Sequence, residues 1–294
     1  MNYVFKADKD TIERIITSFD REYFVEPVAY SDYRINYDSC IITVYSSGKV
    51  MFQGENSRIY AASFFGLPAV EAQEEEHVSS PAVFPQAGSD EVGNGDYFGP
   101  ICVCACYLDR NIYKKVEKLN LIDSKQLTDS AILEIAPQLL KYVPHSLLIL
   151  SPEKYNSVHR ESNLNKIKAL MHNKAYVNLR DKGIKLPKQI VIDQFCSPAS
   201  YYKYIADEKD IIRNITFETK AENKYVSVAC GAIISRYAFL SEMDKMSEKY
   251  GMVFPKGAGE KVDVFIREFV SRYGEAELTR VAKTDYKNTE KALR

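Results

Sequence analysis

Two adjacent carboxylates, Asp90 and Glu91, are followed at once by a glycine-rich bend in the segment G-S-D-E-V-G-N-G-D-Y-F-G-P, residues 88–100. Adjacent acids repel each other and destabilise a fold when they are buried without a cation. A divalent metal removes that cost, and glycines let the backbone approach a bulky phosphate or sugar. A solvated acidic strand end is the simpler alternative. The glycines, the proline and the apolar run that follow the acids favour a metal site.

Two further acids occupy positions where ligands gather in open α/β sheets. Asp193 closes the apolar run Q-I-V-I-D, and Glu222 lies in F-E-T-K-A-E-N-K-Y at the start of a predicted long helix. An acid in a first helical turn is also explained by the helix dipole. Converging carboxylates suit two Mg²⁺ or Mn²⁺ ions, which prefer oxygen ligands and can act on a phosphodiester. Asp90, Glu91, Asp193 and Glu222 are therefore the candidate ligands of a metal-dependent hydrolase, with capping of the helix as the alternative role of Glu222.

Basic residues in three other segments could contact phosphates. Ser124 and Lys125, in D-S-K-Q-L, could supply a hydrogen bond and a positive charge. Lys283 and Lys287 lie in V-A-K-T-D-Y-K-N-T, and Lys49 follows a predicted turn. Lysines of a solvated tail or hairpin are also commonly exposed without contacting a phosphate. The assignments therefore depend on where these residues lie in the fold.

Strands and helices alternate after residue 87 and must position the acids. Asp90 and Glu91 are expected at the head of one strand, and further strands are predicted over 101–108, 146–150 and 189–193. Helices are predicted over 130–143, where Pro137 should kink or shorten the helix, and over 163–182, 221–245 and 259–272. This order predicts an α/β domain with a mixed sheet covered by helices.

Two of these elements carry cysteine or histidine residues that could be mistaken for ligands. Cys102, Cys104 and Cys106 alternate along an apolar strand, so we expect them to be buried together on one face and not to bind zinc. His172 lies in the predicted helix 163–182 and is expected to be partly buried, with a supporting role at the site left open.

The first 66 residues have a different pattern. A helix is predicted over 10–20 and a hairpin over 40–54 around Ser47-Gly48, which together indicate a small α+β unit. Residues 67–86 are rich in acid, serine and proline and are typical of a linker. The predicted domains are therefore 1–66 and 87–294.

The amino-acid composition narrows the classes of protein to which this chain can belong. The net charge of the 294 residues is −1, but residues 87–294 carry a net charge of +5, which suits a polyanion-binding enzyme. Six cysteines without a C-x-x-C pair favour free thiols and the cytoplasm. No signal peptide is apparent, and we expect no apolar stretch to reach the ~18 residues of a membrane span. We expect a cytoplasmic monomer without a membrane or an obligate protein partner.

Several motifs of the chain, taken in their order along the sequence, resemble those of ribonuclease HIII, a bacterial relative of the type 2 ribonucleases H. The likeness covers residues 87–294, and 1–66 resemble the family's N-terminal domain. The motifs are G-S-D-E-V-G-N-G-D-Y-F-G-P, D-S-K-Q-L, Y-N (155–156), H-N-K-A (172–175), V-I-D-Q-F (191–195), T-K-A-E-N-K-Y-V-S-V-A (219–229), P-K-G-A (255–258), the stretch 283–289 and S-S-G-K-V-M-F-Q-G (46–54).

The resemblance implies an RNase H-like mixed sheet with helical cover, preceded by a small domain similar to the TATA-box-binding protein. It implies endonucleolytic cleavage of the RNA strand of an RNA–DNA hybrid, with Mg²⁺ or Mn²⁺, to 5′-phosphate and 3′-hydroxyl ends. It implies a preference for runs of ribonucleotides and phosphate contacts from Lys125, Lys283 and Lys287. The backbone of Gly93, Asn94 and Gly95 is expected to contact ribose 2′-hydroxyls.

Three other functions remain open at this point. The similar ribonuclease HII family cuts at single ribonucleotides, but it usually has Asp in place of Glu222 and G-R-G in place of Gly93-Asn94-Gly95. A hybrid-binding protein without catalysis would be expected to lack one of the acids. A transposase or resolvase of the same superfamily would act on DNA.

Overall fold

The computed structural model describes residues 2–27, 31–66, 83–119, 121 and 127–294. The chain divides into two compact units, Met1–Val78 and Ser79–Arg294. Most of the predicted linker, residues 67–82, lies outside the described residues, and the first strand of the second unit begins at the linker's last residue, Gln86. The two units are described separately.

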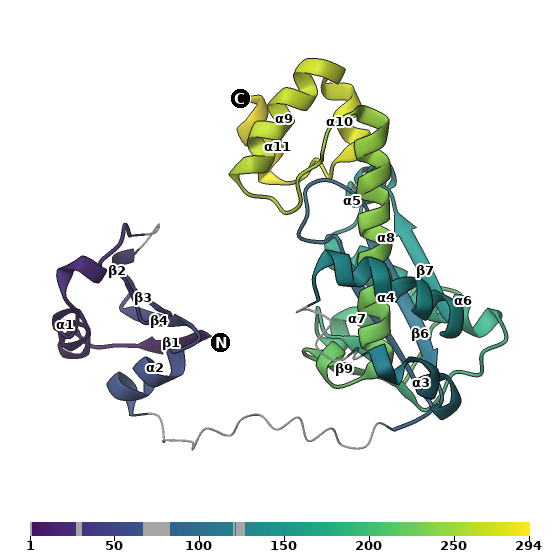
Figure 1. Cartoon of the computed structure of the whole chain (residues 1–294), viewed down its shortest axis with the longest axis horizontal. Coiled ribbons are helices and arrows are strands. Elements are labelled where there is room, and N and C mark those ends of the chain that lie inside the picture. The colour runs from purple at the N-terminus through teal and green to yellow at the C-terminus, as the bar shows by residue number, and fades with distance from the viewer. Residues whose placement is uncertain (1, 28–30, 67–82, 120, 122–126) are drawn as a thin grey trace. The chain divides into compact units, whose positions relative to one another are not determined.

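The first unit confirms the small α+β unit expected at the N-terminus (Figure 1). Its antiparallel sheet has the order β1-β4-β3-β2. The predicted hairpin is confirmed, and Gly48 in its turn has a φ of 76°, a left-handed value that glycine adopts without strain. The elements are β1 (Asn2–Lys6), α1 (Lys9–Thr17), η1 (Arg21–Tyr23), β2 (Ser31–Tyr37), β3 (Cys40–Tyr45), β4 (Lys49–Gly54) and α2 (Ser57–Phe65).

The second unit is built on a five-stranded mixed sheet of order β7-β6-β5-β8-β9. The strands are β5 (Gln86–Val92), β6 (Ile101–Leu108), β7 (His145–Leu150), β8 (Gln189–Asp193) and β9 (Ile215–Glu218). β5 pairs antiparallel with β6 and parallel with β8, and β9 is parallel to β8. The parallel pairs place the carboxyl ends of β5 and β8 at one edge of the sheet.

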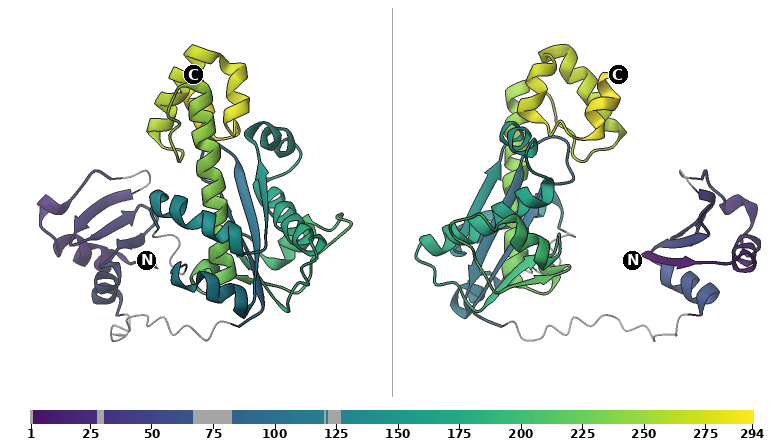
Figure 2. Two further views of the ribbon diagram at one scale, coloured as in Figure 1. Left: turned by 45° about the vertical axis from the view of Figure 1, so that its right-hand side comes forward. Right: turned by 180° about the vertical axis from the view of Figure 1, so that it is seen from behind.

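Helices cover both faces of this sheet (Figure 2). α4 and α8 pack on one face, and α6 and α7 pack on the other. The elements that complete the unit are α3 (Arg110–Val116), η2 (Glu117–Leu119), α4 (Asp129–Tyr142), α5 (Pro152–His159), α6 (Leu164–Asp181), α7 (Pro198–Tyr204), η4 (Ala221–Asn223), α8 (Val226–Tyr250), α9 (Glu260–Tyr273), α10 (Glu275–Val281) and α11 (Lys287–Leu293).

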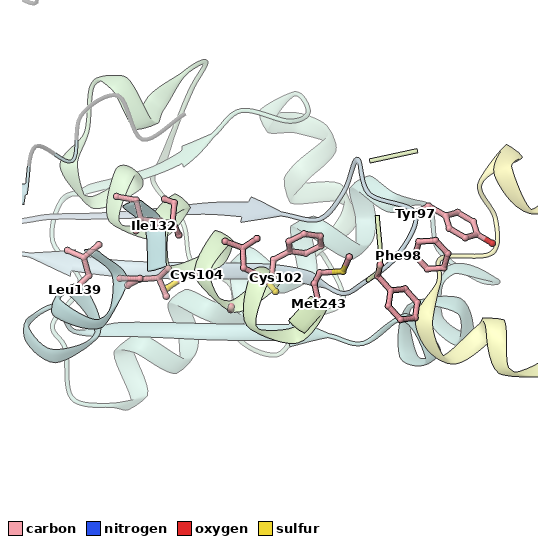
Figure 3. Packing of buried hydrophobic residues seen from close by; sticks show 14 of the residues in the cluster. Tyr97, Phe98, Cys102, Cys104, Ile132, Leu139 and Met243 are labelled. Atoms are coloured by element: carbon pink, nitrogen blue, oxygen red, sulfur yellow. The ribbon is translucent and has the colours of Figure 1, made fainter. Parts of the chain in front are cut away.

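β6 divides the core between the two faces because successive side chains of a strand point in opposite directions. Cys102, Cys104 and Cys106 are fully buried in the cluster that includes α4 and α8 (Figure 3). The residues between them, such as Val103 and Ala105, belong to the cluster under α6. The expectation that the three cysteines share one face as small buried residues is confirmed.

α8 is the central helix of the unit and lies close to β5. A Cβ atom on Gly231 would lie 2.7 Å from the carbonyl oxygen of Cys104 and 3.2 Å from the backbone nitrogen of Asp90. Only glycine permits this approach, so Gly231 brings α8 against the strand that carries the adjacent acids. Among the described residues α8 is the one helix that is long and apolar enough to cross a membrane, but 72% of the relevant window is buried inside the protein. Its hydropathy is therefore that of a core helix.

The structure corrects several sequence-based expectations. Asp90 lies near the end of β5, not at its head, because the strand begins at Gln86. α4 continues through Pro137 to Tyr142, so the proline does not shorten it. The C-terminal stretch ends in helix α11.

Candidate active site

Carboxylates from distant segments meet where β5 and β8 end. Asp90 lies near the end of β5, Asp193 is the last residue of β8, and Glu222 lies on η4. One carboxylate oxygen from each of the three lies within 4.8 Å of the others. β5 and β8 are parallel with Ser89 opposite Ile192, so the next residues along, Asp90 and Asp193, are neighbours at the same edge.

Glu222 reaches this edge through a short turn after β9. Glu218, the last residue of β9, pairs with Asp193, and Lys220 then adopts a left-handed φ of 53°. The backbone N–H of Ala221 donates to Asp193 Oδ1 at 2.9 Å, so the turn holds Asp193 and places the fully buried Glu222 beside it. The expectation that Glu222 opens the long helix is wrong, because α8 begins only after this turn.

The three clustered acids, called here the three-acid group, form an environment that fits a divalent cation. Burial, followed by the charges of Glu91 and Asp193, raises the pKa of Asp90 well above its usual range. The Glu91 N–H donates to Asp90 Oδ1 at 2.7 Å and opposes that rise. A hard cation with oxygen ligands offsets such repulsion, so the donor set of Asp90, Asp193 and Glu222 suits Mg²⁺ or Mn²⁺.

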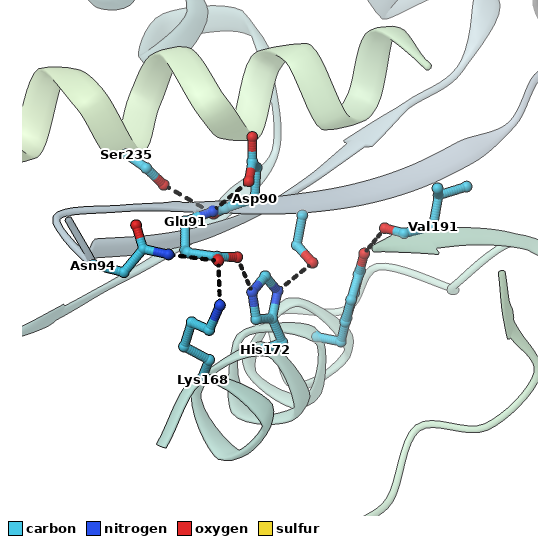
Figure 4. A network of polar contacts seen from close by, with 9 residues as sticks. Asp90, Glu91, Asn94, Lys168, His172, Val191 and Ser235 are labelled. Carbon is cyan, nitrogen blue, oxygen red and sulfur yellow. Dashed lines mark hydrogen bonds and ion pairs between the residues drawn. The ribbon is translucent and has the colours of Figure 1, made fainter. Parts of the chain in front are cut away.

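Glu91 lies apart from the three-acid group, on the opposite face of β5 from Asp90 (Figure 4). Its Oε1 accepts a hydrogen bond from Lys168 Nζ at 2.9 Å, and its Oε2 lies 2.9 Å from His172 Nε2. Burial opposes ionisation of Glu91, but the contacts of His172 and Lys168 outweigh it, and the pKa of Glu91 is lowered. The structure thus brings three of the four predicted ligands together and pairs the fourth with bases.

A cavity of about 230 Å³ opens beside Asp90 and Glu91, between β5, α4 and α8. Arg236 of α8 lines it and donates to Asp129 Oδ1 from Nε at 3.0 Å and from Nη2 at 2.9 Å. Lys256 also bonds Asp129. The cavity therefore brings Arg236 into the same space as Asp90, one member of the three-acid group.

The glycine-rich segment turns sharply directly after the acids. Gly93 has a φ of 98°, and a Cβ atom there would lie 2.1 Å from the carbonyl oxygen of Pro100, so only glycine fits. The hydroxyl of Tyr286 donates to the carbonyl oxygen of Asn94 at 2.7 Å, and Asn94 Nδ2 lies 3.4 Å from Glu91 Oε1. The loop is thereby connected to the C-terminal segment and to the site.

The predicted phosphate contacts lie in different environments. Lys283 is fully buried, and its Nζ donates to the carbonyl oxygen of Gly99 at 2.7 Å, which does not fit a direct phosphate contact. Lys287 is exposed at the start of α11, and Lys49 is exposed at the start of β4 in the first unit. Ser124 and Lys125 lie outside the described residues.

Sequence reasoning missed Lys168, Asp129 and Arg236. Lys168 and His172 are four residues apart and therefore lie on one face of α6, and both are buried. Two basic residues on the buried side of an amphipathic helix are a usable signal, because buried bases require an acidic partner. Asp129 and Arg236 carry no comparable local signal.

The chain is similar to known ribonucleases H along most of its length. The family model for ribonuclease HII matches residues 87–289, and a domain of unknown function, DUF3378, matches residues 2–77. Ribonuclease HIII from Bacillus mycoides strain KBAB4 is 43% identical over 268 residues, which cover 87% of this chain and 86% of that relative. Ribonuclease HIII from Bacillus anthracis is 42% identical over the same length.

Solved structures give the same result. The crystal structure of Bst-RNase HIII in complex with Mn²⁺ matches with a TM-score of 0.70 and 38% identity, covering 100% of this chain and 98% of that one. Ribonuclease H2 from Pyrococcus horikoshii OT3, at 24% identity, covers 70% of this chain and 95% of its own with a TM-score of 0.59, and shares the fold. The predicted RNase H-like fold is confirmed. Likeness over nearly the whole chain and the buried acid cluster lead to one conclusion: the chain belongs to the ribonuclease HIII family and is a ribonuclease H, an endoribonuclease that uses a divalent metal.

Proposed function

We propose that this ribonuclease H cuts the RNA strand of RNA–DNA hybrids at the three-acid group and leaves 5′-phosphate and 3′-hydroxyl ends. The observation that supports this most is the placement of Asp90, Asp193 and Glu222 within 4.8 Å of one another at the edge of an RNase H-like sheet. When bound, two Mg²⁺ or Mn²⁺ ions would activate the attacking water and stabilise the leaving oxygen.

The side chains of this site then have separate tasks. Asp90, Asp193 and Glu222 hold the cations, and Glu91 completes the ligand set from the other face of β5. His172 does not serve as the general base, because its Nδ1 lies 2.7 Å from Ser89 Oγ and its Nε2 contacts Glu91. Proton removal from the water therefore depends on the cations and the carboxylates.

Substrate contacts are assigned to the loop and to exposed bases. The backbone of Gly93, Asn94 and Gly95 is proposed to read ribose 2′-hydroxyls, which distinguish RNA from DNA. Lys287, with Ser124 and Lys125, would contact phosphates of the hybrid. Lys283 acts on the substrate only indirectly, by holding Gly99.

The N-terminal domain, residues 1–66, is proposed to strengthen binding of the hybrid, with Lys49 as one contact. Residues 67–86 would link this domain to the catalytic domain, residues 87–294. The enzyme would act as a cytoplasmic monomer. Removing residues 1–66 should weaken hybrid binding more than it lowers the saturated turnover rate, because the proposed metal ligands all lie after residue 87. Equal losses of binding and turnover would contradict this division.

The decisive experiment is cleavage of an end-labelled RNA–DNA hybrid with and without Mg²⁺, with the product ends mapped. Metal-dependent cuts in the RNA strand with 3′-hydroxyl ends support the proposal, and cutting of DNA alone rejects it. A duplex with one embedded ribonucleotide, compared with one carrying a run of ribonucleotides, tests the ribonuclease HII-like alternative. We expect the run to be cut faster.

A further inference from the structure

Glu91 is held differently from the other acids of the site. Asp90 and Glu91 are consecutive residues of β5, so their side chains leave the strand on opposite faces, Asp90 toward α8 and Glu91 toward α6 (Figure 4). The three-acid group therefore forms without Glu91. Asn94 Nδ2 makes a long contact with Glu91 Oε1 at 3.4 Å, and the shorter contacts with the carboxylate come from α6.

α6 supplies two donors, one to each oxygen of the carboxylate. Lys168 Nζ donates to Oε1 at 2.9 Å, and His172 Nε2 donates to Oε2 at 2.9 Å. An ionised carboxylate only accepts hydrogen bonds, so the Nε2 atom carries the proton. His172 Nδ1 lies 2.7 Å from Ser89 Oγ, which fixes the orientation of the ring. A neutral histidine is sufficient for this arrangement.

Burial and an aromatic ring restrict this pair further. Lys168 is 5% exposed and His172 is fully buried. Phe195, two residues after Asp193, lies under both: Lys168 Nζ is 4.2 Å from the ring centroid, and the His172 ring stacks on it at 5.3 Å and 24°. These contacts leave Lys168 and His172 little freedom to turn away from Glu91.

The charges explain why the pair matters for cation binding. The ammonium of Lys168 offsets the charge of Glu91, so Glu91 adds little to the attraction that the site exerts on a cation. Most of that attraction in the free enzyme comes from the three-acid group. A bound phosphate would add the negative charge that the paired Glu91 does not supply, so a cation can engage Glu91 once the hybrid is bound.

We propose that Lys168 and His172 are positioning residues for cleavage, which hold the Glu91 carboxylate in one place and offset its charge until substrate arrives. The free enzyme then binds a divalent cation at the three-acid group and engages Glu91 only when the hybrid is bound. This proposal rests on the function proposed above.

The test combines Mn²⁺ titration of the substrate-free enzyme with steady-state cleavage of a hybrid. Lys168→Met removes the charge and the donor but keeps the aliphatic chain. We expect it to bind Mn²⁺ about fivefold more tightly, because a cation near the ligands is lost. We also expect a kcat about 10–100-fold lower, the usual cost of losing a group that orients a metal ligand. Lys168→Arg should restore most of both properties.

Lys174→Met is the matched control, because Lys174 is an exposed lysine of the same helix. It should leave the Mn²⁺ affinity and kcat unchanged. If Lys168→Met does not fold, Lys168→Gln removes the same charge and keeps a donor, and the Mn²⁺ titration is made on that variant.

The proposal is overturned if Lys168→Met keeps the wild-type kcat, or if its Mn²⁺ affinity is unchanged or weaker. A lower kcat with unchanged Mn²⁺ affinity would mean that Lys168 acts on the substrate instead of on Glu91. Because the titration contains no substrate, its result is independent of hybrid cleavage. A wild-type enzyme inert on hybrids would reject the proposed function, and the titration would still decide whether Lys168 offsets the charge of Glu91.

Discussion

Lys283 Nζ donates a hydrogen bond to the carbonyl oxygen of Gly99 at 2.7 Å, and the lysine has no exposed surface. The backbone N–H of Lys283 donates to the carbonyl oxygen of Tyr97, and the N–H of Gly99 donates to that of Val281, both at 2.9 Å. These bonds fasten the segment after the glycine loop to the C-terminal part of the chain. A lysine predicted to bind phosphate is therefore part of the scaffold of the loop.

The first prediction concerns pH and Lys283. Burial lowers the pKa of Lys283 to about 8, from 10.5 in an exposed chain. Between these values the unfolded state binds more protons, so the free energy of unfolding should rise with pH across this window, by roughly 3 kcal/mol. Lys283→Met should lack this rise. Urea unfolding of both proteins at pH 7.5 and pH 10 measures the difference, and parallel pH profiles would contradict the assignment.

The second prediction concerns Asp90 and metal removal. Burial and neighbouring acids raise the pKa of Asp90, which means that its ionised form destabilises the metal-free fold. Asp90→Asn should therefore melt at a higher temperature than the wild type in EDTA. Added Mn²⁺ should stabilise the wild type more than the variant, and cleavage by the variant should be lost. Retained cleavage would reject Asp90 as a ligand.

The third prediction compares two glycines of the loop. Gly93→Ala places a methyl group against the Pro100 carbonyl oxygen and requires a positive φ, so we expect a loss of about 2 kcal/mol or more in the free energy of unfolding. Gly95→Ala is the control, because nothing lies within 4 Å of its Cβ position and its φ is not in the left-handed region. Similar unfolding free energies for the two variants would show that the turn is not constrained as described.

The fourth prediction concerns Tyr286, whose hydroxyl donates to the carbonyl oxygen of Asn94 at 2.7 Å. Tyr286→Phe removes a hydrogen bond that stabilises the loop conformation by about 1 kcal/mol. The KM for a hybrid should therefore rise about fivefold, with little change in kcat. Tyr273→Phe, which loses a hydrogen bond to Tyr250 elsewhere in the C-terminal helices, should keep the wild-type KM. An unchanged KM in Tyr286→Phe would mean that the loop is not held by this contact.

Local patterns are sufficient to predict much of the fold. The strands 101–108 and 189–193 are predicted with the observed bounds, and the hairpin turn at Gly48 is predicted correctly. Each of these signals is local in sequence, because it depends on the alternation of side chains along a strand or on the conformational freedom of a glycine in a turn. The same kind of local pattern places Asp193 at the end of its strand, whereas Asp90 and Glu91 were expected at the head of theirs.

The sequence by itself therefore determined four of the five strands of the second unit's sheet, all but β9, and identified the candidate acids. Only the tertiary structure decided that Asp90 joins Asp193 and Glu222 while Glu91 pairs with Lys168 and His172. It also decided that Lys283 is buried. The alternation of a strand separates neighbours onto opposite faces, and the partners on each face come from segments more than 70 residues away in the chain. Such contacts depend on packing between segments that are distant in the sequence, and the local periodicity of side chains does not predict them.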